Sequence, residues 1–183
     1  MKYLKPLNFH KDFFKDFLIK KDSKHGRLLG LDVSDKYVSL AVSDWKNITA
    51  VPLRALDRQE SIMTSMAADL FQSLIAEHNL VGFVVGTNYD LLDNRPTLEE
   101  ETQIFVDNLR KTGIVEGLKY TFWDRGITSK NAEFVLKQHV EFILENLNSP
   151  PDMSKTIMEK CRAVSALQGY LDCTNKMVKE DLD

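Results

Sequence analysis

The sequence has little cysteine and no excess of positive charge. It contains two cysteines, Cys161 and Cys173, in 183 residues, and its 24 Lys and Arg are outnumbered by 27 Asp and Glu, giving a formal net charge of −3. This balance excludes a general attraction to nucleic acid, so contact with a polyanion would need a local cationic patch. The two cysteines fall in one predicted helix about 18 Å apart, too far for a disulfide, and we expect reduced thiols.

Long apolar runs are also absent, and we expect no import peptide. No segment approaches the roughly 20 apolar residues of a membrane span. The first 27 residues are basic but contain Asp12, Asp16 and Asp22, whereas an import peptide is rich in Arg and Ser and poor in acids. From the lack of a membrane span and of an import peptide we expect a protein of the cytoplasm, with the nucleus as the alternative, and no membrane partner. No Cys and His residues stand at the spacing of zinc ligands, so we expect no zinc site.

The length is sufficient for one domain with a well-buried core. We expect this domain to span 27–176, preceded by a helical extension over 1–26 and followed by a short tail over 177–183. In the extension Phe9, Phe13 and Phe17 recur every four residues, which is the spacing of an amphipathic helix. We expect this helix to pack on the domain; binding to another surface is the alternative.

The pattern of apolar residues predicts the order of helices and strands in the domain. Three strands come first, then strands alternate with helices, which predicts an α/β fold with a mixed five-stranded sheet: three antiparallel strands, then parallel crossovers, and helices on both faces. A polar loop is expected over 87–96. The expected strands are 27–33, 37–44, 48–56, 80–86 and 118–124, and the expected helices are 60–79, 96–112, 129–144 and 154–176.

Carboxylates end two of these strands. Asp32 follows the first apolar run and Asp124 follows the last, and in such sheets ligands bind at the carboxyl ends of the central strands. Two-metal phosphodiester hydrolysis needs several carboxylates around a pair of Mg²⁺ or Mn²⁺ ions. Asp32, Asp124 and Glu159 on the last helix are the candidates. The alternatives are turn-forming roles for the two Asp residues and an ordinary solvated position for Glu159.

Four stretches together resemble one known family. "LGLDVSDKYVSLAVSD" is similar to its opening hairpin, "VGFVVGTNYDLLDNR" to its central strand and following loop, "TFWDRGITSKNAEFVL" to a strand ending Asp-Glu-Arg before a helix, and "KTIMEKCRAVSALQGYLD" to its last helix. The family is YqgF, also called RuvX-like or pre-16S rRNA nuclease and once described as Holliday junction resolvase-like. It belongs to the ribonuclease H-like superfamily, and the resemblance covers 27–174.

The resemblance implies a ribonuclease H-like three-layer fold and metal-dependent hydrolysis of phosphodiester bonds in structured nucleic acid, in ribosomal RNA maturation. It implies Asp32, Asp124 and Glu159 as the catalytic acids, with Asp32 and Glu159 binding Mg²⁺ or Mn²⁺. The implied partner is structured RNA, with branched DNA as the alternative. Both a monomer and a homodimer remain open.

The chain departs from the family at several positions around the expected site. Arg125 stands where the family has Glu, Gly126 where it has Arg, and Arg162 where it has Ala, while Glu159 replaces an Asp. A fixed cation beside the metals would compete with them. Ser34 and Ser39 in the hairpin occupy positions where the family has Gly, which permits positive φ and close backbone approach more readily than Ser does.

Cations near the expected cleft suggest a phosphate-binding patch. We expect Arg125, Lys130, Lys160 and Arg162 to contact nucleic acid; scattered surface charges are the alternative. The Arg125 substitution also favours a second function, a catalytically degenerate relative that binds RNA, DNA or a protein partner without cutting. A third, an ATPase of the actin or sugar-kinase kind, ranks last because that fold needs a second lobe and a second phosphate-binding hairpin.

Overall fold

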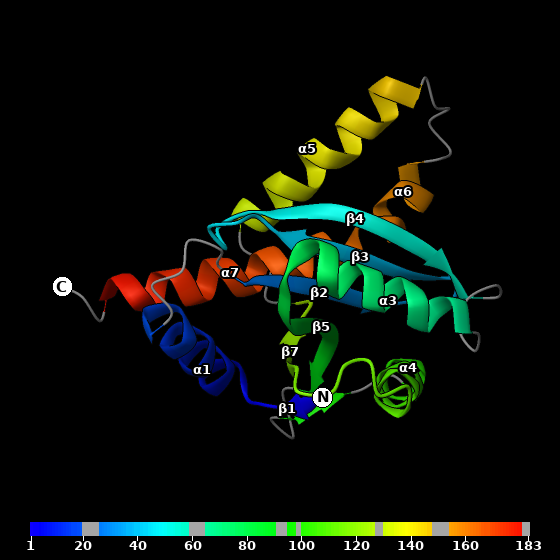
Figure 1. The fold of residues 1–183 in the computed structure, drawn as a ribbon. Coiled ribbons are helices and arrows are strands. Elements are labelled where there is room, and N and C mark those ends of the chain that lie inside the picture. The colour runs from blue at the N-terminus through cyan, green and yellow to red at the C-terminus, as the bar shows by residue number, and fades with distance from the viewer. Residues whose placement is uncertain are drawn as a thin grey trace.

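A mixed β-sheet forms the centre of the computed structural model (Figure 1), which describes residues 1–19, 26–58, 65–90, 95–97, 100–126, 130–147 and 154–180. The main path of the sheet has the strand order β1-β7-β5-β2-β3-β4, and β6 pairs with β5 beside it. The five long strands confirm the predicted sheet. They are β2 (Arg27–Val33), β3 (Tyr37–Ser43), β4 (Ala50–Asp57), β5 (Leu80–Asp90) and β7 (Lys119–Asp124).

The first three long strands form the predicted antiparallel meander. β3 pairs antiparallel with both β2 and β4. Residues 28–33 and 38–43 are all buried, so β2 and β3 are covered on both faces. β4 lies at the edge, where Pro52 meets Ala41 beside a shift in register. A proline, which has no N–H to donate, is tolerated at such a position.

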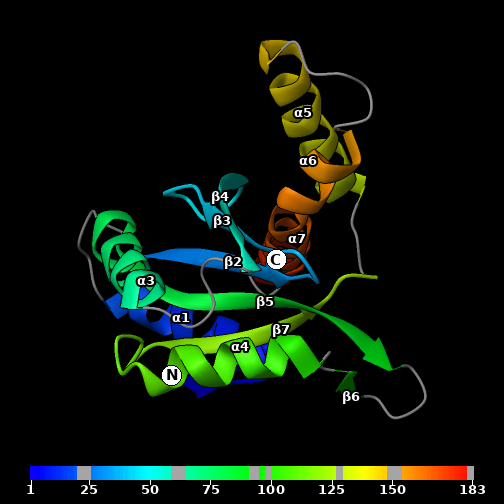
Figure 2. The ribbon, with the colours of Figure 1, turned by 90° about the vertical axis from the view of Figure 1, so that its right-hand side faces the viewer.

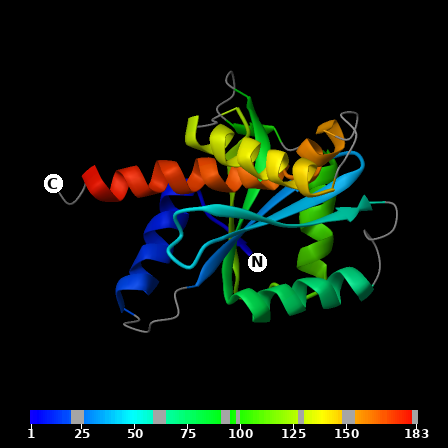
Figure 3. The ribbon, with the colours of Figure 1, turned by 90° about the horizontal axis from the view of Figure 1, so that it is seen from above.

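The remaining strands are parallel, and helices cover both faces. β5 pairs parallel with β2 and β7. On one face, α3 (Ser65–His78) and α4 (Glu100–Lys111) contribute Phe71 and Phe105 to the core. On the other face, α7 (Arg162–Glu180) supplies Leu167, and α5 (Lys130–Leu147) packs alongside α7 (Figures 2 and 3). This arrangement confirms the three-layer ribonuclease H-like fold.

The segment after the central strand differs from the prediction. The expected polar loop over 87–96 and a helix opening at Pro96 are wrong, because β5 continues to Asp90 and pairs antiparallel with β6 (Arg95–Thr97). α4 begins only at Glu100. Pro96 lies opposite Tyr89 in a short edge strand, a position that tolerates a missing N–H. Backbone pairing outweighs the polar composition that favoured a loop.

The N-terminal segment is attached to the sheet by a strand and a helix. β1 (Lys2–Tyr3) pairs parallel with β7, and α1 (Pro6–Ile19) packs on the α7 face. Phe9 is buried and Phe13 is half-buried in this core, as the phenylalanine spacing predicted. The side chain of Phe17 lies outside the described residues.

The single helix predicted over 154–176 is wrong. α6 (Ser154–Lys160) and α7 are separate, with Cys161 between them. The break coincides with a contact from the sheet: the hydroxyl of Ser39 on β3 accepts a hydrogen bond from the N–H of Ala163 at 3.0 Å. Helix N-termini need such an acceptor for their first N–H groups. Ser39 thus caps the start of α7.

The Leu-Gln-x-Tyr-Leu run of the last helix is a packing motif. Leu167, Tyr170 and Leu171 are fully buried, as expected. Gln168 is also buried, and its side chain ties α7 to the turn between β3 and β4: Oε1 accepts from the N–H of Ala50 at 2.7 Å, and Nε2 donates to the carbonyl of Ile48 at 2.9 Å. The sequence pattern did not predict this role for Gln168.

Replacing Gln168 with leucine should lower the free energy of unfolding by about 1–3 kcal/mol, because the buried N–H of Ala50 loses its acceptor. Urea denaturation followed by circular dichroism measures the change. Gln138→Leu, at an exposed position of α5, is the matched control and should stay within about 0.5 kcal/mol of the wild type. Equal effects of the two substitutions would contradict this role of Gln168.

Candidate functional site

Asp32 lies near the carboxyl end of β2, opposite Ser39 of β3, on the face that α7 covers. Its side chain is 1% exposed. Space for the carboxylate comes from Gly86 on β5, where an added Cβ would lie 2.5 Å from Oδ2 of Asp32. A buried carboxylate is stable only beside a compensating cation or several donors.

Arg125 supplies the first cation. It follows β7, and its N–H donates to the carbonyl of Thr87 at 2.8 Å, which extends the β5–β7 pairing. Its Nε lies 2.6 Å from Oδ2 of Asp32. Its Nη2 donates to the carbonyls of Val33 and Gly86 at 3.2 and 3.4 Å. Arg125, with a 13%-exposed side chain, therefore joins the ends of β2 and β7 to the middle of β5.

Arg162 supplies the second cation from the first residue of α7. Its Nε lies 3.4 Å from Oδ1 of Asp32, and its side chain is 39% exposed. Each oxygen of the Asp32 carboxylate thus faces a different guanidinium. The three groups together carry one net positive charge. Both arginines, which the resemblance gave as departures from the family pattern, meet at the same acid.

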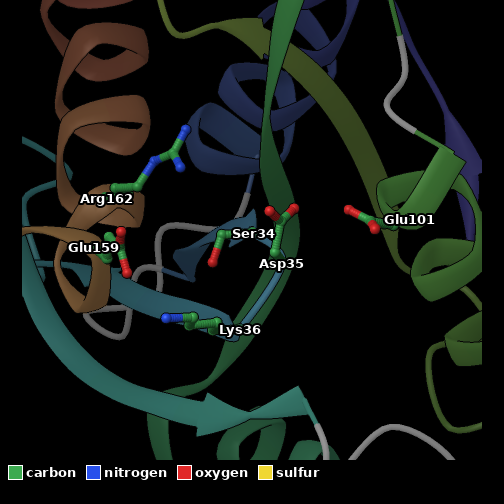
Figure 4. Close-up of a pocket in the computed structure, with 6 residues that line it drawn as sticks. All are labelled: Ser34, Asp35, Lys36, Glu101, Glu159 and Arg162. Atoms are coloured by element: carbon green, nitrogen blue, oxygen red, sulfur yellow. The ribbon is translucent and has the colours of Figure 1, made fainter. Parts of the chain in front are cut away.

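The other two predicted acids take different positions. Asp124 ends β7 as expected, but its Oδ1 accepts from the N–H of Gly126 at 2.8 Å, which is the turn-forming arrangement. Glu159 lines a cavity of about 340 Å³ together with Asp32, Arg125 and Arg162. It also lines a second cavity of about 340 Å³ (Figure 4), whose other lining residues are Ser34, Asp35, Lys36, Glu101 and Arg162.

The predicted cations gather only in part. Arg125 and Arg162 both line the cavity of Asp32. Lys160 is exposed, and its Nζ lies 4.9 Å above the ring of Tyr37, near the β2–β3 turn. Lys130 begins α5, but its side chain lies outside the described residues.

A divalent cation does not fit this arrangement. Both oxygens of Asp32 face guanidinium groups, and Asp124 turns to its own backbone. Within the described residues, no three His, Cys, Asp or Glu side chains gather as a metal site would require. Mg²⁺ sites need hard oxygen ligands that are not already engaged by other cations.

Comparison with known proteins assigns the family. A family model described as RuvX, Holliday junction resolvase, matches residues 26–173. The chain belongs to the RuvX family. This confirms the resemblance drawn from the four sequence stretches.

Curated RuvX-like relatives match over almost their full length. A protein of Lachnospira eligens is 28% identical over 150 residues, which cover 82% of this chain and 99% of the relative. One of Ligilactobacillus salivarius is 28% identical over 155 residues, which cover 85% of this chain and 98% of the relative. Both carry the name "Putative pre-16S rRNA nuclease".

Solved structures are more distant. The yeast mitochondrial Holliday junction resolvase Ydc2 gives a TM-score of 0.48 at 11% identity, covering 93% of this chain and 89% of its own. Thermus thermophilus RuvC in complex with a Holliday junction gives a TM-score of 0.45 at 11% identity, covering 81% of this chain and 96% of its own. In the described residues of this RuvX protein, no helix is long and apolar enough to cross a membrane.

Cys161 directly precedes Arg162 and Cys173 lies further along α7, and both have unreactive surroundings. Neither forms a disulfide, and burial raises the pKa of the Cys161 and Cys173 thiols. Because the thiolate is the reactive form, alkylation by iodoacetamide should be slow at neutral pH and should accelerate only as the pH passes the ordinary thiol range. Mass spectrometry of time points measures it; rapid labelling of both residues at pH 7 would contradict the prediction.

Proposed function

We propose that this RuvX protein is a nuclease that acts on structured RNA during ribosomal RNA maturation, in the cytoplasm. Family membership over 26–173 and the names of the curated relatives support this function. The observation that carries it is the cavity at the carboxyl ends of the strands, where the acid Glu159 and the cation Arg162 lie beside the Asp32 carboxylate.

The residues of this cavity have the chemistry for hydrolysis. In our proposal Glu159 accepts a proton from the attacking water, and the oxygen of that water bonds to phosphorus as the bond to the leaving oxygen breaks. The leaving oxygen takes a proton from solvent. Arg162 stabilises the charge that builds on the phosphate, and Asp32 positions Arg162. Mg²⁺ or Mn²⁺ remains a prediction from the resemblance, and its binding would require both arginines to leave Asp32.

A nuclease assay tests the proposal. Structured RNA and four-way DNA junctions are incubated with the wild type in Mg²⁺, in Mn²⁺ and in chelator. We expect cleavage by the wild type and a 10²–10⁴-fold lower rate for Glu159→Gln, the usual range for loss of a general base. Glu145→Gln, at an exposed position of α5, should keep the wild-type rate. Absence of cleavage by folded wild type under all conditions would overturn the nuclease proposal.

A second function is favoured by one specific contact. Arg125 stands at a family acid position and holds the buried carboxylate of Asp32 at 2.6 Å. A protein with this contact can retain the cleft for binding while losing the acid that cleavage would use. Tight binding of structured RNA by the wild type, without cleavage in any metal, would favour a catalytically degenerate binding protein over a nuclease.

A further inference from the structure

The two arginines around Asp32 are not equivalent. Arg125 is 13% exposed, and three acceptors from two strands engage its Nε and Nη2. Arg162 is 39% exposed, and it pairs with Asp32 through Nε, at 3.4 Å. Because a guanidinium presents five donors in a planar fork, Arg162 can face Asp32 with one edge and a further anion with the other.

The cavity next to Arg162 is lined by side chains of different chemical kinds. Arg125, Arg162 and Ser165 carry hydrogen-bond donors, and Asp32 and Glu159 are its two acids. Leu136 of α5 and Met158 of α6 add apolar surface, and Met158 is 40% exposed. A volume of about 340 Å³ lies within the range of small-ligand sites, about 300–1,000 Å³.

The donor-bearing and apolar side chains match the two halves of a nucleotide. The carboxylate of Asp32 is already compensated by two guanidiniums, so it does not repel an incoming phosphate as an uncompensated acid would. Arginine binds phosphate through paired, charge-assisted hydrogen bonds that need no metal bridge. A sulfur-containing and an aliphatic side chain offer an apolar surface for a base or ribose.

We propose that this cavity binds one nucleotide of a single-stranded or frayed nucleic acid without a divalent cation. Arg162 binds its phosphate, Leu136 and Met158 contact its base or ribose, and Arg125 is a positioning residue that takes the place of a metal as the fixed counterion of Asp32. The inference rests on the proposed function in one respect, that the ligand is nucleic acid. It does not require cleavage.

Equilibrium binding of a labelled ten-nucleotide single-stranded RNA, in chelator and in Mg²⁺ at several salt concentrations, tests the site. We expect the wild type to bind equally with and without Mg²⁺. Arg162→Gln should weaken binding about tenfold and reduce the slope of log affinity against log salt by about 0.7. Met158→Ser should weaken binding several-fold and leave that slope unchanged.

Arg110→Gln is the matched control, because Arg110 is half-exposed near the far end of α4 and pairs with Asp107. It should bind as the wild type does. Arg162→Lys, which keeps the charge but loses the fork, should fall between the wild type and Arg162→Gln. Thermal denaturation establishes that each variant is folded. A DNA strand of the same sequence, run in parallel, shows whether the site distinguishes the two sugars.

The possible failures are distinguishable. If RNA binds only in the presence of Mg²⁺, or if Arg162→Gln and Arg110→Gln weaken binding equally, the nucleotide site is overturned while the proposed function stands. If the wild type binds the ten-nucleotide strand in neither condition, the nucleotide site is overturned, whereas the proposed function is decided by the cleavage assay on structured RNA.

Discussion

Replacing Asp32 with alanine is expected to lower the free energy of unfolding by about 3–5 kcal/mol, the usual cost of removing one partner of a buried ion pair. The substitution leaves the guanidinium of Arg125, 13% exposed, without its carboxylate. The sign of the change distinguishes two kinds of site. In a cluster of carboxylates that lacks its metal, removing one acid relieves repulsion and raises the free energy of unfolding. Here Asp32 is paired with arginines, so its removal should lower the free energy of unfolding. Urea denaturation in chelator measures the change.

Two further variants isolate the ion pair. Asp124→Ala removes an acid from a half-exposed turn, where it accepts one hydrogen bond from Gly126, and should cost about 1 kcal/mol. In the Asp32→Ala, Arg125→Met double variant no buried charge is left unpaired, so it should be more stable than Asp32→Ala alone. If Asp32→Ala and Asp124→Ala lower the free energy of unfolding by the same amount, the buried ion pair of Asp32 and Arg125 does not stabilise the fold.

Replacing Phe9 with alanine is also expected to cost about 3–5 kcal/mol, the range for truncating a buried phenylalanine. Its side chain is 2% exposed and makes an edge contact with Tyr170 at 5.9 Å between ring centroids. Its ring fills the space above Gly82, where an added Cβ would lie 2.6 Å from it. The N-terminal helix would then contribute directly to the core of the domain.

Leu7→Ala is the control for Phe9→Ala. Leu7 lies on the same helix but is 52% exposed, so its truncation should change the stability by no more than about 0.5 kcal/mol. Thermal and urea denaturation of the two variants give the comparison. A Phe9→Ala protein as stable as Leu7→Ala would show that α1 is dispensable for the fold.

Periodic apolar residues were sufficient to predict the main elements. The run before Asp32 and the continuous apolar stretch of β5 produced the correct strands because burial on both faces of a sheet leaves that pattern, although Val81 is 37% exposed. Pro52 correctly indicated an edge strand. The two-residue β1 and three-residue β6 were missed, since segments so short show no period, and their formation depends on the neighbours with which they pair.

The features that depend on tertiary contacts were not predictable in this way. The break at Cys161 coincides with a hydroxyl on β3 that accepts from the start of α7, and Gln168 binds a turn more than a hundred residues away in sequence. At the site, the sequence identified Asp32, Arg125 and Arg162 separately. That both arginines face the same carboxylate follows only from the approach of β7 and α7 to β2.

Calorimetric titration with Mn²⁺ tests whether guanidinium groups take the place of a divalent cation beside Asp32. The wild type and Asp32→Asn should show the same weak heats, without a stoichiometric site. The Arg125→Glu, Arg162→Ala variant, which carries the residue types that the resemblance implies for the family, should acquire a stoichiometric Mn²⁺ site. Stoichiometric binding of Mn²⁺ by the wild type that Asp32→Asn abolishes would contradict the account.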